Sequence, residues 1–170
     1  PALGRLMSRP EVAAQYWFHL DDLVRTVFSA QQLEPVIDRL AGDYLPRAEV
    51  DRIKSFAAKR CDFVLSQIPL ELTVTTGLAK RDGFFVSHSP ELELSGQAPA
   101  IGTVAVEVNG QTADWSAEEA RWQTKVALRP GLNHLLVRAL DASGNVVARQ
   151  HTDVWHGDAP VRSLGQRLTQ

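Results

Sequence analysis

The chain has 170 residues, of which 44% are hydrophobic and 22% charged, and its 18 basic and 20 acidic side chains leave a net charge of -2. This composition is that of one folded domain or two small ones, and it excludes disordered, collagen-like and coiled-coil chains. The balanced charge offers no basic field for nucleic acid, and no apolar run is long enough to span a membrane, so we expect neither as a partner.

The residues before Pro69 have a helical period. Ser8-Arg9-Pro10-Glu11 has the spacing of a capping box and predicts the start of a first helix. Its apolar positions recur every three or four residues: Val12, Tyr16, Trp17, Leu20, Leu23, Val24, Val27 and Phe28.

Two further helices follow in the same half. Ser29 has the chemistry of a second cap, and the apolar face of the second helix comprises Leu33, Val36, Ile37, Leu40 and Tyr44 before Pro46 ends it. The third helix is expected from about Ala48 to Gln67. We therefore predict a three-helix segment over residues 1–69.

After Pro69 the period changes from 3.6 to 2 and β-branched residues dominate. Seven short strands are expected, the first at residues 70–75 and the last at residues 146–155, and Asn109-Gly110 is the strongest hairpin signal among them. Turns every 8 to 12 residues or so are typical of an antiparallel sandwich. The predicted fold class is thus α+β, with an antiparallel β-sandwich over residues 70–156 and a flexible tail over residues 157–170.

The familiar catalytic motifs are absent from the chain: there is no G-x-S-x-G, no phosphate-binding loop, no H-E-x-x-H and no dinucleotide fingerprint. Its five histidines do not have the spacing of metal ligands, so we expect no metal and no cofactor. A small enzyme would need one of four histidines to meet carboxylates in one cleft: His19, His88, His134 or His151.

Three other groups have structural interpretations that we favour. Cys61 lies on the apolar face of the third helix, which indicates an inert buried thiol, although Lys59 and Arg60 beside it leave a reactive thiol open. The adjacent carboxylates of Asp21-Asp22 point about 100° apart and indicate a solvated face. The segment from Asp141 to Asn145 has part of a calcium-loop pattern but fits a hairpin turn better.

The tryptophans are the strongest candidates for a binding role, because exposed aromatic rings stack on sugars and form interface hot spots. Trp122 shares the parity of Val126 and Leu128 and is predicted to lie in the core. Trp115, in a polar connection, and Trp155, at the end of the last strand, are candidate binding residues. The alternative for each of them is a satellite cluster that seals a strand end.

The β half resembles the bacterial Ig-like modules of secreted multidomain proteins, including the B-domain type found beside glucodextranase-like enzymes. The matching pieces run from residue 91 to residue 155: Leu92-x-Leu94-Ser95-Gly96, Val108-Asn109-Gly110-Gln111, Trp122, Leu128-x-Pro130-Gly131-x-Asn133 and Ala139-Leu140-Asp141-x-x-Gly144-Asn145. The resemblance implies the fold, and it implies little about function because such modules are mostly spacers, docking units or accessories.

The helical half is similar to the C-terminal helices of the CotH kinase family over about 60 residues. The matching runs are Met7 to Glu11 with Tyr16, Leu20 and Leu23, then Val27-Phe28-Ser29, Leu33-x-x-x-Ile37-Asp38-x-Leu40, Ile53 to Arg60 and Phe63-Val64-Leu65-x-Gln67. The nucleotide-binding lysine and metal-binding aspartates of such kinases belong to an upstream body, and no residue here matches them.

These observations predict a non-catalytic C-terminal region of a larger secreted or surface bacterial protein. Because the first residue is Pro1 and not Met, we expect a processed protein or a piece of a longer one. The CotH resemblance implies an upstream domain of the same protein, which would carry any kinase-like activity. The helices have broader apolar faces than a 69-residue bundle easily covers, so Trp17, Phe18 and Phe28 are expected to contact that domain, the sandwich or another protein chain. The alternative is a carbohydrate-binding accessory module, in which Trp115 and Trp155 are exposed and stack on a glycan.

Overall fold

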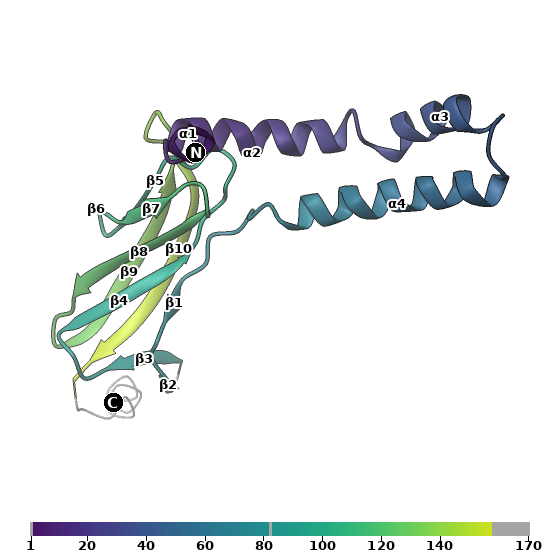
Figure 1. The fold of residues 1–170 in the computed structure, drawn as a ribbon. Helices are drawn as coiled ribbons and strands as arrows, with labels where there is room; N and C mark the ends of the chain where they lie inside the picture. The colour runs from purple at the N-terminus through teal and green to yellow at the C-terminus, as the bar shows by residue number, and fades with distance from the viewer. Residues whose placement is uncertain (1, 82, 158–170) are drawn as a thin grey trace.

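The computed structural model describes residues 2–81 and 83–157, so the tail predicted at residues 157–170 lies almost wholly outside the described range. The fold is α+β, as predicted, and its two halves differ in shape. A β-sandwich forms one end of the molecule, and the helices form a long arm that projects from one end of the sandwich (Figure 1). The helices do not close into a compact bundle.

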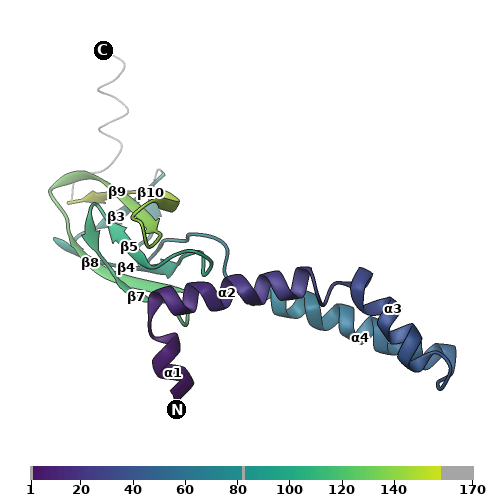
Figure 2. The same ribbon diagram turned by 90° about the horizontal axis from the view of Figure 1, so that it is seen from above.

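The arm has four helices where three were predicted: α1 (Ala2–Met7), α2 (Pro10–Arg25), α3 (Ala30–Ala41) and α4 (Arg47–Ser66). The chain runs outward along α2 and α3 and returns along α4, and the view in Figure 2 shows α1 turning away from α2 at the base of the arm. The bounds of α4 lie within one residue of those expected. The helix α1 was missed because six residues are fewer than the window in which a helical period can be recognised.

The predicted serine caps are wrong. Ser8 Oγ donates to the carbonyl of Arg5, and Ser29 Oγ donates to the carbonyl of Thr26, so each hydroxyl bonds back to the preceding turn. Neither side chain caps the helix that follows it. Pro10 in the first turn of α2 is consistent with a helix start that needs no side-chain cap, since proline has the required φ and no orphan N–H.

The sandwich consists of two sheets, which we name sheet A and sheet B. Sheet A has the order β1-β4-β8-β7 and sheet B the order β2-β3-β10-β9-β5-β6. The strands are β1 (Thr75–Thr76), β2 (Lys80–Arg81), β3 (Phe84–Ser87), β4 (Glu91–Gln97), β5 (Ala105–Val108), β6 (Gln111–Thr112), β7 (Asp114–Ser116), β8 (Arg121–Ala127), β9 (Gly131–Leu140) and β10 (Val146–His156). The four-stranded sheet facing a sheet built on two long central strands is the arrangement of an Ig-like sandwich.

Two strand predictions need correction. Sheet B is mixed rather than antiparallel, because β3 pairs with the end of β10 in parallel. The strand expected at residues 70–75 is reduced to β1, and the preceding segment is held to β4 by single bonds: Thr73 N–H donates to the carbonyl of Gln97, and Gln97 N–H donates to Thr73 Oγ1. The hairpin at Asn109 and Gly110 is confirmed, with φ of 51° and 83°.

The core lies between the sheets and contains Trp122, as predicted, with 2% of its surface exposed. It is formed by alternate residues of both sheets, which is the burial pattern of paired sheets that each present one face to water. Besides Trp122, the core within the described residues contains seven side chains with at most 1% exposure: Leu94, Ala98, Val106, Val108, Val137, Ala139 and Val154.

Candidate functional site

The arm exposes large apolar side chains along three helices and their connections. Among the described residues, the most exposed are Tyr44 (83%), Phe56 (69%) and Leu40 (67%). We call this set the arm surface; it also includes Tyr16, Phe18, Leu23, Val27, Phe28, Val36, Leu45, Ile53 and Phe63. Many exposed apolar side chains on a folded protein commonly mark an interaction site.

The arm surface is exposed because its helices bury few side chains against one another. None of the side chains in α3 is buried, and in α4 only Val50 is. The apolar side chains of α4 occupy two stripes. One stripe is half-buried and consists of Ala57, Cys61 and Val64, and the other is exposed and consists of Ile53, Phe56 and Phe63. One helix therefore presents two apolar faces.

Two polar contacts hold the returning helix in place. Lys54 Nζ of α4 lies 2.7 Å from Asp38 Oδ2 of α3, and the lysine side chain is only 15% exposed. Cys61 Sγ donates to the carbonyl of Phe28, 3.2 Å away, between α2 and α3. The thiol therefore contributes a contact within the arm, although it is half-buried rather than buried as predicted.

The base of the arm packs on the end of the sandwich through small residues and two tryptophans, a region that we call the joint. One cluster there contains Met7, Ala13 and Ala117, and a second contains Ile68, Ala100 and Ala120. Trp17 packs on the second cluster, and its Nε1 donates to the carbonyl of Ala117 at 3.2 Å. Trp17 is thus engaged within the chain.

Trp115 belongs to the joint. It is half-buried and packs against both joint clusters and against the sandwich core. It pairs directly with the core residue Trp122, so the two side chains share the inward face of sheet A. The Nε1 of Trp115 is buried and has no hydrogen-bond partner in the described residues.

Trp155 lies on the other sheet. Its cross-strand neighbours are Val86 and Leu132, with which it forms an apolar row across β3, β10 and β9. The neighbouring Val154 is fully buried, so Trp155 is on the outward face of sheet B. The structure therefore does not bring Trp115 and Trp155 together, and they do not form one stacking platform for a sugar.

Phe18 and Phe28 are both exposed, at different places along the arm. Phe18 borders a hollow of about 330 Å³ between α2 and two loops of the sandwich, which also contains Ile101 and Asp141. Phe28 follows α2 at the elbow before α3. Of the three aromatic residues predicted for an interface, Trp17 packs within the joint, and Phe18 and Phe28 remain on the arm surface.

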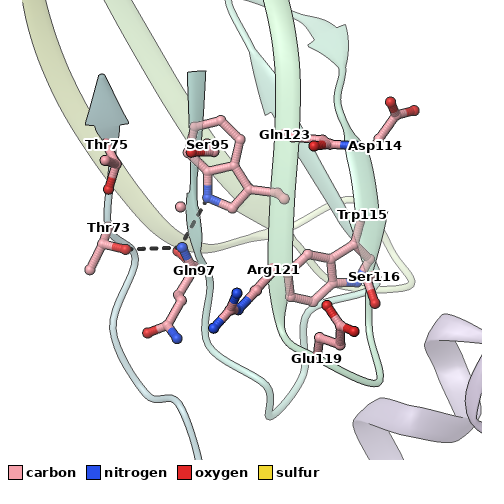
Figure 3. Close-up of a pocket in the computed structure, with 12 residues that line it drawn as sticks. Thr73, Thr75, Ser95, Gln97, Asp114, Trp115, Ser116, Glu119, Arg121 and Gln123 are labelled. Carbon is pink, nitrogen blue, oxygen red and sulfur yellow. Dashed lines mark hydrogen bonds between the residues drawn. The ribbon is translucent and has the colours of Figure 1, made fainter. Parts of the chain in front are cut away.

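A polar groove of about 720 Å³ lies across the outward face of sheet A (Figure 3). Its lining combines hydroxyl, amide and charged side chains of both signs, among them Ser95, Gln97, Asp114, Arg121 and Gln123. Trp115 borders the groove but packs inward, so no exposed ring is available there for stacking. Sequence reasoning missed this groove, because outward polar residues of a strand look like any solvated face.

An exposed ion pair of the sandwich, Glu93 with Lys125, shifts the pKa values of both partners in the direction that any ion pair does. The pKa of Glu93 is lowered by a hydrogen bond and the charge of Lys125, and the pKa of Lys125 is raised by the same contact. No three His, Cys, Asp or Glu side chains within residues 2–81 and 83–157 come close enough to hold a metal ion. None of the helices described here is long and apolar enough to cross a membrane.

Comparisons with known proteins found no matching family model and no matching curated protein. Two solved structures overlap the chain, each with a TM-score of 0.34. A fibronectin(III)-like module of CbhA from Clostridium thermocellum is 18% identical, over 52% of this chain and 100% of that one. An FMN-binding β-glucuronidase from Faecalibacterium prausnitzii is 17% identical, over 54% of this chain and 13% of that one. The fold assignment rests on the strand order of the chain itself.

Proposed function

We propose that this chain is a non-catalytic structural and interaction module, in which an Ig-like sandwich holds a helical arm against a folded domain that precedes it in a larger, secreted or surface CotH-like bacterial protein. In this proposal residues 1–69 complete the preceding domain, and residues 70–156 form a separate sandwich. The observation that carries the proposal is the arm surface, whose aromatic and aliphatic side chains remain in water in the isolated chain.

The chemistry of the arm favours an apolar partner surface. Four ion pairs form within the described part of the arm, among them Arg25 with Asp21 and Lys54 with Asp38, and these charges need no partner from outside. Burial of apolar surface stabilises an interface by about 25 cal/mol per Å² removed from water. Side chains such as Leu40, Phe56 and Phe63 would therefore supply most of the docking free energy.

A covalently attached partner suits such a surface. A domain on the same polypeptide is held at high effective concentration, so a docking surface of moderate affinity stays occupied without a tight bimolecular contact. The similarity of the helical half to the end of the CotH kinase fold supports the same arrangement. The glycan alternative has less support, because Trp115 is engaged in the joint and Trp155 lies on the opposite sheet.

The test uses site-specific photo-crosslinking in the longest natural polypeptide that contains this chain. A photoreactive phenylalanine at Phe56 is expected to crosslink to residues that precede Pro1, whereas the same group at the sandwich position Leu132, which is 38% exposed, is not. Crosslinks from Phe56 only to other polypeptides would overturn the intramolecular arrangement.

A second measurement keeps the test independent of crosslinking chemistry. The 170-residue chain is expected to bind a hydrophobic dye or to self-associate in light scattering, and Leu40→Gln with Phe56→Gln should reduce both effects. Leu132→Gln is the matched control on the sandwich. An isolated chain that is monomeric and binds no dye would contradict the proposed docking surface.

A further inference from the structure

One long strand of sheet B has an open edge. β10 pairs with β9 along almost its whole length, but on its other side β3 pairs only with Val154, Trp155 and His156. Within the described residues, the strand register places only β9 beside residues 146–153. An unpaired edge of this length offers a row of N–H and C=O groups to an added strand.

The two sheets end in short strands. Sheet A ends in β1 and β7, with two and three residues, and sheet B ends beyond β5 in the two-residue β6. Very short edge strands are one way in which proteins avoid unwanted pairing. The open part of β10 is longer than these strands, and it begins with two exposed valines, Val146 and Val147, where the register with β9 shifts.

A buried polar atom beside the open edge lacks a partner. Gln150 lies opposite Val137 in the register, on the inward face of β10, and its Oε1 is buried with no hydrogen-bond partner in the described residues. A buried acceptor without a donor costs free energy, commonly about 1–3 kcal/mol. A strand added along this edge would bring N–H groups close to that acceptor.

The outward face of the open edge favours an acidic partner. Arg149 and His151 are exposed there, and Arg149 has no ion pair with any described residue. Two other charged pairs lie on this face: Arg138 with Glu107 at 2.8 Å, and His134 with Asp153 at 2.7 Å. Arg149 thus remains available to an added strand.

We propose that residues 146–153 of β10 form a binding site for an extended peptide, which adds to sheet B as an edge strand. Main-chain hydrogen bonds along the edge would supply most of the affinity, as is general for strand addition. Specificity would come from alternate side chains of the peptide: small or apolar residues facing inward beside Ala148 and Gln150, and an acidic residue facing outward beside Arg149. This site does not depend on the proposed role of the arm.

The probe is a fluorescein-labelled eight-residue peptide in which valine and glutamate alternate, titrated into the 170-residue chain and followed by fluorescence anisotropy. We expect saturable binding, together with slower hydrogen exchange of the backbone amides of residues 147–153. Arg149→Glu should weaken binding by about fivefold, the size expected for reversing one exposed charge. Arg129→Glu, at an exposed position in the turn before β9, is the matched control and should leave the Kd unchanged.

The backbone is tested with the same peptide N-methylated at its four central residues, which retains the side chains and the charge but removes the donors. Loss of binding of this peptide supports strand addition, and equal binding of the two peptides overturns it. Absence of any binding or exchange protection also overturns the proposal. A doubled mass in light scattering, with residues 147–153 protected in the absence of peptide, would assign the edge to a second copy of the chain instead.

Discussion

The indole nitrogen of Trp17 donates a hydrogen bond to the backbone carbonyl of Ala117, 3.2 Å away and 100 residues later in the sequence. This bond joins the first long helix of the arm to the connection between β7 and β8. The helices of the arm bury little against one another, so the direction of the arm depends on contacts at its base. The joint therefore sets how the arm surface is presented relative to the sandwich.

Replacing Trp17 by phenylalanine tests this relationship. Trp17→Phe retains an aromatic ring but removes the N–H, so we expect a loss of about 1 kcal/mol in the free energy of unfolding and a wider distribution of arm directions. Spin labels on the arm and the sandwich would measure that distribution as interlabel distances. Tyr16→Phe, at the exposed neighbouring position, should change neither quantity. An unchanged distance distribution in Trp17→Phe would show that the bond does not orient the arm.

Trp115 is predicted to act in stability rather than in ligand binding. Because its ring touches both joint clusters and the core, Trp115→Ala should lower the free energy of unfolding by about 3 kcal/mol, the range for removing a large packed ring. Trp155→Ala is the comparison, since Trp155 is also half-buried but contacts a single row on sheet B. Chemical denaturation measures both variants. Equal losses would contradict a special role of Trp115 at the joint.

A glycan array completes this comparison. The unmodified chain and Trp115→Ala are compared at a temperature where the variant remains folded. If Trp115 serves the joint, the substitution should abolish no glycan signal of the unmodified chain. A specific signal that depends on Trp115 or Trp155 would instead favour the carbohydrate-binding alternative. The circular dichroism spectrum of each variant establishes that it is folded under the conditions of the array.

The sequence predicts those features that local physics determines. Asn109-Gly110 gives a hairpin because both residues tolerate positive φ, and the inward parity of Trp122 follows from its strand. The serine caps were mispredicted because a hydroxyl can bond to the turn before it as well as to the helix after it. The joint could not be predicted, because Ala117 and Ala120 give no periodic signal and meet the arm only through contacts distant in sequence.

The role of Gly96 in joining the helical half to the sandwich is a further prediction. A Cβ at this position would overlap the carbonyl oxygen of Thr73 and lie 3.0 Å from Trp122 Nε1. Gly96→Ala must displace the segment that bonds to β4, at a cost of about 1–3 kcal/mol for an overpacked site. Gly77→Ala is the matched control, since no atom lies within 4 Å of its Cβ. Thermal unfolding should separate the two variants, and equal midpoints would show that the segment yields freely.

The turn between β9 and β10 should make the free energy of unfolding depend on pH through the carboxyl group of Asp141. The pKa of Asp141 is lowered, first by the hydrogen bond from the Asn145 side chain and then by backbone N–H groups of the same turn. Asn145 Nδ2 lies 3.0 Å from Asp141 Oδ2, and Asn145 N lies 2.8 Å from Oδ1. A carboxyl whose pKa is lowered by folding contributes stability above its ordinary pKa, and this contribution is lost as the pH falls through the folded value.

Asn145→Ala removes the first of these donors. We expect the pKa of Asp141, followed by NMR of its carboxyl carbon, to rise toward the ordinary aspartate value of about 3.9. The variant should be less stable than the wild type at neutral pH, and the difference should narrow as the pH falls below that value. Ser143→Ala is the control, because only the backbone N–H of Ser143 bonds to Asp141. A stability difference that stays constant between neutral pH and pH values below the folded pKa would show that Asn145 acts through the turn geometry alone.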